Sequence, residues 1–206
     1  MSCSPLPLRN PRRGQALIEF TLTLVIILCV LTGAFELSRY CSLVLRMSSA
    51  VRETARLIVA EDIDPNPVRT VAENNAEIQT RLNNDIFPFV DNLIAPGNIL
   101  NDGKIWVSYL TRQPSPTSPT DPLQDRIVVT YQFAYPPAAL TDSRSSWNST
   151  FGLPGSIVPT ARIPLAGFSR GESTVAVELY HRTQFILPQT FLRTAKVDKV
   201  YDMAIF

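Results

Sequence analysis

Hydrophobic residues gather in one block near the N-terminus of the chain. From Gln15 to Phe35 the sequence reads QALIEFTLTLVIILCVLTGAF, a run of 21 residues in which Glu19 carries the only charge. A helix of this length rises roughly 31 Å, which matches the hydrocarbon core of a bilayer. The pattern therefore predicts a membrane-spanning helix over residues 15–35.

The helical pattern continues beyond this block, but it becomes amphipathic. Apolar or small side chains recur every three to four residues between charged ones. The expected stripe consists of Leu37, Cys41, Val44, Leu45, Ser48, Val51, Ala55 and Ile58. No proline interrupts residues 14–64, and prolines at 65 and 67 then stop a helix. We expect residues 36–60 to continue the membrane helix to about Val59.

The remaining residues, 61–206, predict a small α+β domain with an antiparallel sheet, packed on the long helix. A polar helix is expected over residues 68–87, ending near Phe87-Pro88. Alternation predicts strands over residues 104–110, 126–135 and 172–182. In the second strand, Ile127, Val129, Tyr131 and Phe133 are expected on one face. The tail, residues 196–206, fits either period, with a helix slightly preferred.

Two Pro-rich segments connect these strands. Residues 112–122 (RQPSPTSPTDP) hold four prolines and predict a hairpin-like connection of extended character. Residues 136–171 have few strand signals and predict a long irregular excursion. Such an excursion is either a binding element or a packed structural loop, and the packed loop is the favoured interpretation.

Charge and cysteine content narrow the class of protein. The chain has 19 basic and 18 acidic residues, a formal charge of +1, so no basic field favours nucleic acid. Its three cysteines are Cys3, Cys29 and Cys41, and none lies in the large C-terminal part. We therefore expect no disulfide framework in that part.

The flanks of the apolar block predict its orientation. Arg9, Arg12 and Arg13 precede the block, and such a cluster stays in the cytoplasm. The C-terminal domain would then lie outside. Glu19 stands out because a carboxylate inside the apolar edge is costly; it is either a paired functional group or a side chain that reaches the interface.

The run Arg12-Arg13-Gly14-Gln15-Ala16-Leu17-Ile18-Glu19-Phe20 resembles the class III signal of type IV pilin-like proteins, which prepilin peptidase cuts after the glycine. More closely, residues 12–58 resemble the TadE-like family, the minor pseudopilins of tight-adherence (Tad) pilus systems. The matching features are Arg13-Gly14-Gln15-Ala16, the Glu19-Phe20 pair, the region of Phe35 and Arg39, and residues 49–56.

This resemblance implies a pilin-like fold and a structural subunit rather than an enzyme, without a cofactor or metal. Residues 1–14 become a cytoplasmic leader, with Gly14 and Gln15 as the processing site and Glu19 and Phe20 in subunit assembly. Cleavage would create an α-amine at Gln15 that could pair with Glu19 of a neighbouring subunit. It would also remove three arginines, leaving 16 basic against 18 acidic residues, a formal −2.

The implied partners are prepilin peptidase, other pilin or pseudopilin subunits, the inner-membrane assembly platform and the lipid bilayer. The implied location is the bacterial cytoplasmic (inner) membrane, in a single pass, with the N-terminus in the cytoplasm and incorporation into a surface pilus. The alternative is an uncleaved single-pass protein whose outer domain binds a ligand through residues 136–171.

Other motifs give weaker signals. Residues 167–171 (GFSRG) match the pattern of a nucleophile elbow, and a hydrolase would use Ser169 with His181. That mechanism needs a strand before the serine and a helix after it, whereas here a loop leads into a strand. Glu61, Asp62 and Asp64 lack the spacing of an EF-hand. Asn148-Ser149-Thr150 fits a glycosylation acceptor, a pattern of low specificity.

Overall fold

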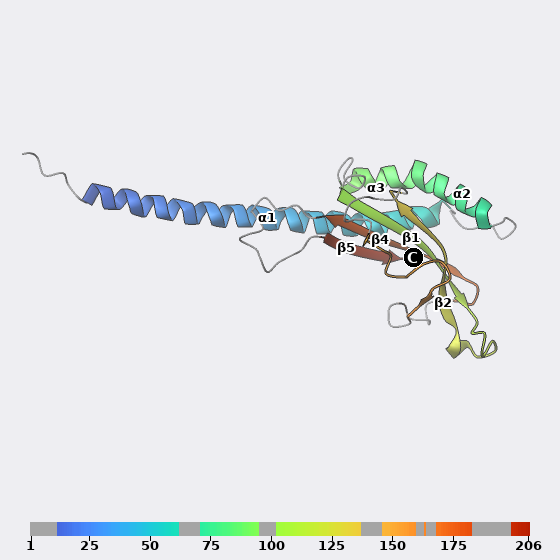
Figure 1. The fold of residues 1–206 in the computed structure, drawn as a ribbon. Coiled ribbons are helices and arrows are strands. Elements are labelled where there is room, and N and C mark those ends of the chain that lie inside the picture. The colour runs from blue at the N-terminus through green and yellow to red at the C-terminus, as the bar shows by residue number, and fades with distance from the viewer. Residues whose placement is uncertain are drawn as a thin grey trace, which may run out of the picture. The chain divides into compact units, whose positions relative to one another are not determined.

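The computed structural model describes residues 12–61, 71–94, 102–136, 146–159, 163, 168–182 and 199–206. These residues form two compact units. The described part of the first unit is residues 12–41, and the second comprises all described residues from Ser42 onward. The fold combines a long N-terminal apolar helix with an antiparallel five-stranded sheet, so the α+β class predicted from the sequence is confirmed (Figure 1).

Helix α1 runs without a break from Arg12 to Ala60, 49 residues, as the absence of proline predicted (Figure 1). Gly33, within this span, does not interrupt it. The predicted end near Val59 is confirmed to within one residue.

The C-terminal part of α1, which belongs to the second unit, buries one face. The buried side chains recur at helical spacing and are those of Met47, Ala50, Val51, Thr54, Ala55 and Ile58. The Thr54 hydroxyl donates to the carbonyl of Ala50 at 2.6 Å, so this buried polar group is satisfied within the helix. Thr54 was absent from the predicted stripe.

Part of the predicted stripe is wrong. Leu37, Cys41 and Leu45 are exposed, Leu45 to 69%. These residues follow one another at a spacing of four, and each such step turns about 40° beyond a full turn, so the series drifts around the helix. The buried face mixes spacings of three and four, which keeps its residues on one side.

Three helical segments follow α1, and here the prediction of a helix ending near Phe87-Pro88 is wrong. Helix α2 spans Val71–Arg81, the π-helical turn η1 spans Leu82–Ile86, and α3 spans Phe87–Ile94. In the π turn, the Phe87 N–H donates to the carbonyl of Leu82, five residues back. The wider turn lies immediately before Pro88, where a normal helix would suffer from the missing N–H and the ring, so the chain can remain helical.

The sheet has the order β3-β2-β1-β4-β5, and all neighbours are antiparallel. Its strands are β1 (Gly103–Gln113), β2 (Arg126–Tyr135), β3 (Ile157–Val158), β4 (Ser173–Arg182) and β5 (Lys199–Ile205). Three strands were predicted at their correct places. Residues 112–122 do connect two paired strands, β1 and β2, although β1 extends two residues into this segment. The tail is strand β5, so the preference for a helix was wrong.

A register shift in β2 corrects the predicted face of that strand. Tyr109 of β1 pairs with Tyr131, whereas the next residue, Leu110, pairs with Val129, so Thr130 is an extra residue. Such a bulge moves the residues beyond it to the opposite face. Consequently Tyr131 and Phe133 lie on one face of the sheet, and Ile127 and Val129 lie on the other.

Both faces of the sheet are covered. The helix face carries Ile105, Val107 and Tyr109 of β1, and Tyr135 on the same face stacks on Phe87 of α3 with ring centroids 4.6 Å apart. The loop face carries Lys104, Trp106, Ser108 and Leu110 of β1 and, on β4, Ala176, Glu178 and Tyr180. Because two layers cover one sheet, β4 is buried at consecutive positions and not only at alternate ones.

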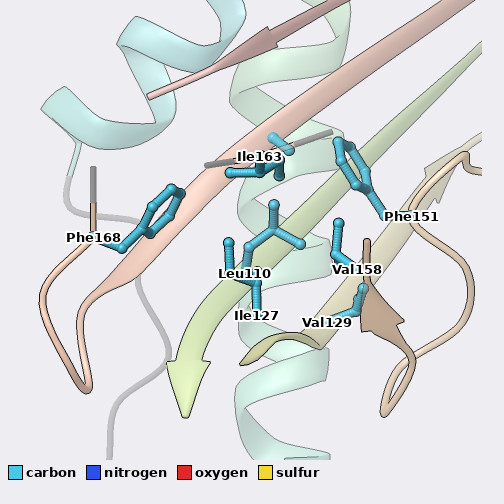
Figure 2. Packing of buried hydrophobic residues seen from close by; sticks show 8 residues of the cluster. Leu110, Ile127, Val129, Phe151, Val158, Ile163 and Phe168 are labelled. Atoms are coloured by element: carbon cyan, nitrogen blue, oxygen red, sulfur yellow. The ribbon is translucent and has the colours of Figure 1, made fainter. Parts of the chain in front are cut away.

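The excursion 136–171 supplies the core of the loop face. Figure 2 shows Leu110 and Ile127 lying between Phe168 on one side and Phe151 and Val158 on the other. All these side chains are buried, together with Val129, Ile163 and Ala176. Each Å² of apolar surface removed from water stabilises the fold by about 25 cal/mol, so burial favours a fixed position for these residues. The described part of the excursion therefore packs as a structural loop.

Candidate functional site

The predicted processing and assembly residues lie at the start of α1. The side-chain amide of Gln15 donates to Oε1 of Glu19 at 3.1 Å, one helical turn away. Phe20 follows on the next position and is 67% exposed. The backbone of Arg12 and Arg13 forms the first turn of α1, and Arg9 lies outside the described residues.

Gly14 lies inside the helix, and nothing in its surroundings requires a glycine. Among the described residues, a Cβ added at Gly14 would meet no atom within 4 Å outside the adjoining helix backbone. Glycine also costs a helix about 1 kcal/mol relative to alanine. Neither packing nor helix formation therefore explains why residue 14 is a glycine. This points to recognition of Gly14 by another molecule.

The apolar block presents its side chains outward on all sides. Large hydrophobic side chains are between 42% and 69% exposed along this stretch; they include Leu17, Ile18, Leu22, Val25, Ile26, Leu28, Val30 and Leu31. Within the described part of the chain, α1 is the one helix long and apolar enough to cross a membrane. An exposed apolar surface of this size needs lipid or other apolar helices around it.

The hydroxyl groups in this block are satisfied internally. Thr21, Thr23 and Thr32 each donate to the carbonyl four residues back, all at 2.8 Å. In lipid, where no water can serve a polar group, this bond removes most of the cost of a threonine. The only acidic group of the block, Glu19, is bonded by Gln15 alone among the described side chains.

The loop face also contains a buried carboxylate, Glu178 of β4, which was not singled out from the sequence. Glu178 is fully buried and accepts hydrogen bonds from Ser149 Oγ, from both the N–H and the hydroxyl of Thr150, and from the Tyr201 hydroxyl at 3.1 Å. Its donors come from the excursion and from β5. The carboxylate thus ties three parts of the domain together, which hydrophobic alternation could not reveal.

A second missed cluster centres on Asp125, just before β2. The Arg112 Nε donates to Oδ2 of Asp125 at 2.9 Å, and Arg170 donates to both carboxylate oxygens at 2.8 Å. These hydrogen bonds, above all those from Arg170, hold the pKa of Asp125 below its ordinary value. Arg112 also donates to the carbonyls of Pro122 and Phe168. The cluster joins the β1–β2 connection to the turn that precedes β4.

The structure does not bring Ser169 and His181 together. The Ser169 N–H donates to the carboxylate of Glu172 at 2.7 Å in the turn before β4, and this bond lowers the pKa of Glu172. His181 lies near the other end of β4, opposite Gly103. Eight strand residues, 173–180, lie between them and span roughly 26 Å. The arrangement required of a serine nucleophile and its base is absent from this pair.

The remaining candidate positions show ordinary surroundings. Glu61 lies 3.9 Å from Arg81, whose side chain also donates to the Glu61 carbonyl at 3.0 Å. Asp62 and Asp64 lie outside the described residues. No group of three potential metal ligands occurs among the described residues. Cys29 and Cys41 are both free thiols and exposed.

Comparison with known proteins adds one match. Residues 14–56 match the family model of TadE-like proteins. This confirms the resemblance predicted from the sequence over 43 of the 206 residues. No curated protein and no solved structure matches the chain. A TadE-like segment that coincides with an exposed apolar helix indicates a membrane-anchored, pilus-associated component of a structural kind.

Proposed function

We propose that this chain is a minor pilin-like subunit, a pseudopilin, that takes part in assembling a Tad-type adhesive pilus. The observation that carries the proposal is the TadE-like match over residues 14–56, which coincides with a helix exposing apolar side chains all around it. A pilin-like subunit must move from lipid into a bundle of similar helices. A helix without its own apolar partners suits both environments.

Residues 1–14 act as a leader that prepilin peptidase removes between Gly14 and Gln15. The open space around Gly14 supports this role, because the helix tolerates larger residues there while a protease recognises a small one. Arg9, Arg12 and Arg13 hold the leader in the cytoplasm until insertion is complete. The domain beyond the membrane then lies outside the cytoplasmic membrane.

Glu19 guides assembly once the leader is gone. In the uncleaved helix its carboxylate accepts a hydrogen bond from the Gln15 side chain. Cleavage places a positive α-amine on Gln15, and in a bundle the amine of one subunit pairs with Glu19 of the next. An unpaired carboxylate in an apolar bundle is costly, so this pairing selects one register. Phe20, beside it, packs against the neighbouring helix.

Mass spectrometry of the membrane-extracted chain tests the proposal. The expected mature N-terminus is Gln15, and replacing Gly14 by valine should leave residues 1–14 attached. The valine should not disturb the helix, since a side chain at this position meets nothing. Recovery of mostly intact chain from cells that carry the pilus system would count decisively against processing.

A second measurement tests the assembly role of Glu19 separately. Glu19→Leu should reduce co-purification with partner pilin subunits at least about tenfold, the effect of losing roughly 1.4 kcal/mol of pairing. Thr23→Leu, a polar-to-apolar change one turn further along, serves as the matched control and should have little effect. Unchanged assembly of the Glu19→Leu subunit would show that the amine–carboxylate pairing is wrong.

A further inference from the structure

The sheet has two outer edges, and one of them is open over most of its length. On the β3 side, β3 pairs only with Ile127 and Val128 of β2. Val129 exchanges main-chain hydrogen bonds with Gly155 and Ser156. From residue 130 to 135, no described segment pairs with the outer side of β2. The other outer edge is strand β5.

The ladder shows which main-chain groups of β2 point outward. The main chain of Arg112 bonds toward the β4 side of β1, to Gly171 and Glu172. In an antiparallel ladder, successive residues bond to opposite sides of a strand. Leu110, two residues before Arg112, therefore also bonds toward β4, whereas Tyr109 bonds toward β2 and its partner Tyr131 bonds back to β1. The N–H and C=O groups of Gln132 and Ala134 therefore point away from the sheet.

The same reasoning applies to β5. Phe206 and Val175 exchange two main-chain hydrogen bonds, at 2.9 and 3.0 Å, so Phe206 bonds toward β4. The alternate residues Met203 and Ile205 then have outward-pointing main-chain groups. Their side chains lie on the loop face, as do those of Gln132 and Ala134.

These two edges are compatible with each other. Strands β2 and β5 run in opposite directions, because each step from β2 through β1 and β4 to β5 is antiparallel. We propose that copies of this chain join edge to edge, with residues 130–135 of one copy pairing antiparallel with β5 of the next. Copies related by translation then form one continuous sheet, in which all helix faces lie on one side and all loop faces lie on the other.

This is a head-to-tail contact that repeats without reversing the chain. Chains anchored in one membrane share a single orientation, so a contact that repeats without rotation suits an anchored protein. The contact depends on neither the leader nor Glu19. It can therefore fail or hold independently of the proposed pilus function.

A groove of about 440 Å³ lies along the β2 edge, lined by residues 130–133, by Asn75, Ala76 and Gln79 of α2 and by Pro154 of the excursion. The Gly152 carbonyl of the excursion accepts a hydrogen bond from the Gln132 side chain at 2.8 Å, a contact that does not use the main chain of Gln132. The edge sequence TYQFAY carries no charge, proline or glycine. Charges and prolines on edge strands prevent pairing with other chains, and so do bulges such as the one at Thr130; the regular part of this edge is therefore residues 131–135. The β5 edge has Lys199 and Asp202, which meet no like charge on β2.

One group on β5 restrains the contact. The Asp202 carboxylate accepts a hydrogen bond from the Met203 N–H at 2.8 Å, and this N–H is one of the outward groups. Full pairing requires the carboxylate to release it. Asp202 thus keeps association weak and prevents uncontrolled growth of the sheet.

Hydrogen exchange on the full chain in detergent micelles tests the contact. Raising the concentration of the chain should slow amide exchange together in residues 130–135 and 199–206, at least about tenfold. Protection of neither segment would overturn the proposal. Protection of residues 130–135 alone would also overturn it, since the added strand would then belong to another protein.

Two substitutions of opposite expected effect sharpen the test. Ala134→Pro removes one outward N–H without touching the β1 ladder and should abolish the concentration-dependent protection, whereas Ala134→Ser should retain it. Asp202→Ala frees the Met203 N–H and should bring protection at about tenfold lower concentration. If Ala134→Pro fails to fold, the wild-type measurement and Asp202→Ala still decide: an Asp202→Ala chain with no stronger self-association contradicts the contact.

Discussion

At the scale of single residues, Glu178 is the polar group on which the loop face depends. Its carboxylate accepts hydrogen bonds from Ser149, Thr150 and Tyr201 without exposure to solvent. A buried donor that loses its acceptor costs about 1–3 kcal/mol. Several donors share this one acceptor, so its loss affects all of them at once.

We expect Glu178→Ala to lower the free energy of unfolding by about 3 kcal/mol. Urea unfolding of the full chain in detergent measures this by tryptophan fluorescence, since Trp106 and Trp147 are the two tryptophans and both lie in this domain. Tyr201→Phe removes a single donor and should cost about 1 kcal/mol. Equal unfolding midpoints for Glu178→Ala and wild type would refute the role given to this carboxylate.

His181 gives the domain a pH dependence of a definite sign. Burial lowers the pKa of His181 below its ordinary value of 6.5, while the nearby Asp102 carboxylate opposes the shift. Below about pH 6.5, His181 therefore binds a proton more readily in the unfolded chain than in the folded chain. Stability is complete above this pH and falls as the pH drops toward the pKa of the folded state.

Unfolding midpoints measured between about pH 7 and pH 5 should therefore decrease for the wild type. His181→Phe removes the titrating group and should flatten this part of the profile. If the variant shows the same slope as the wild type, groups other than His181 are responsible for the pH dependence.

At the scale of elements, the Asp125 cluster joins the end of the β1–β2 connection to the turn that precedes β4. Asp125→Ala removes the carboxylate that both Arg112 and Arg170 bond, so the link between the two segments is lost. We expect faster proteolysis and faster amide exchange in residues 121–126 and 168–172, with the β1–β4 ladder unchanged. Arg56→Ala, which removes an exposed pair with Glu53 on α1, is the matched control and should change neither segment.

Most elements could be predicted from local patterns, and the failures have identifiable physical causes. Periodicity places α1 and the strands β2 and β4 because each has a long, regular pattern. It fails at Pro88, where a π turn absorbs the proline, and at Thr130, where a bulge reverses the face. Both features depend on how neighbouring elements pack, which short-range spacing does not contain.

The candidate site residues likewise fall into two groups: those that a local sequence motif identifies and those that only the fold brings together. Gly14, Gln15 and Glu19 are close in sequence, so a motif can identify them together. Asp125 and Arg170 are 45 residues apart, and Glu178 is 28 from Thr150. Only the sheet register brings such groups together, and a single sequence gives no sign of it.

At the scale of the whole molecule, the two cysteines of helix α1 provide a test of topology. Cys29 lies within the apolar block and Cys41 beyond it, and both are exposed free thiols. If the domain lies outside the cytoplasmic membrane, a membrane-impermeant maleimide added to spheroplasts should label Cys41 but not Cys29. A Cys41→Ser variant should lose this label, and labelling that requires permeabilised cells would reverse the proposed orientation.

Helix α1 has one further consequence for how this protein can be handled and released. Its residues from Met47 to Ile58 bury side chains in the same compact unit as the sheet, although they continue the helix of the apolar block. A soluble fragment that started at residue 61 would lack these side chains and expose the surfaces they cover. Shedding of an intact domain by proteolysis therefore requires a cut within the helix itself, before Ser42.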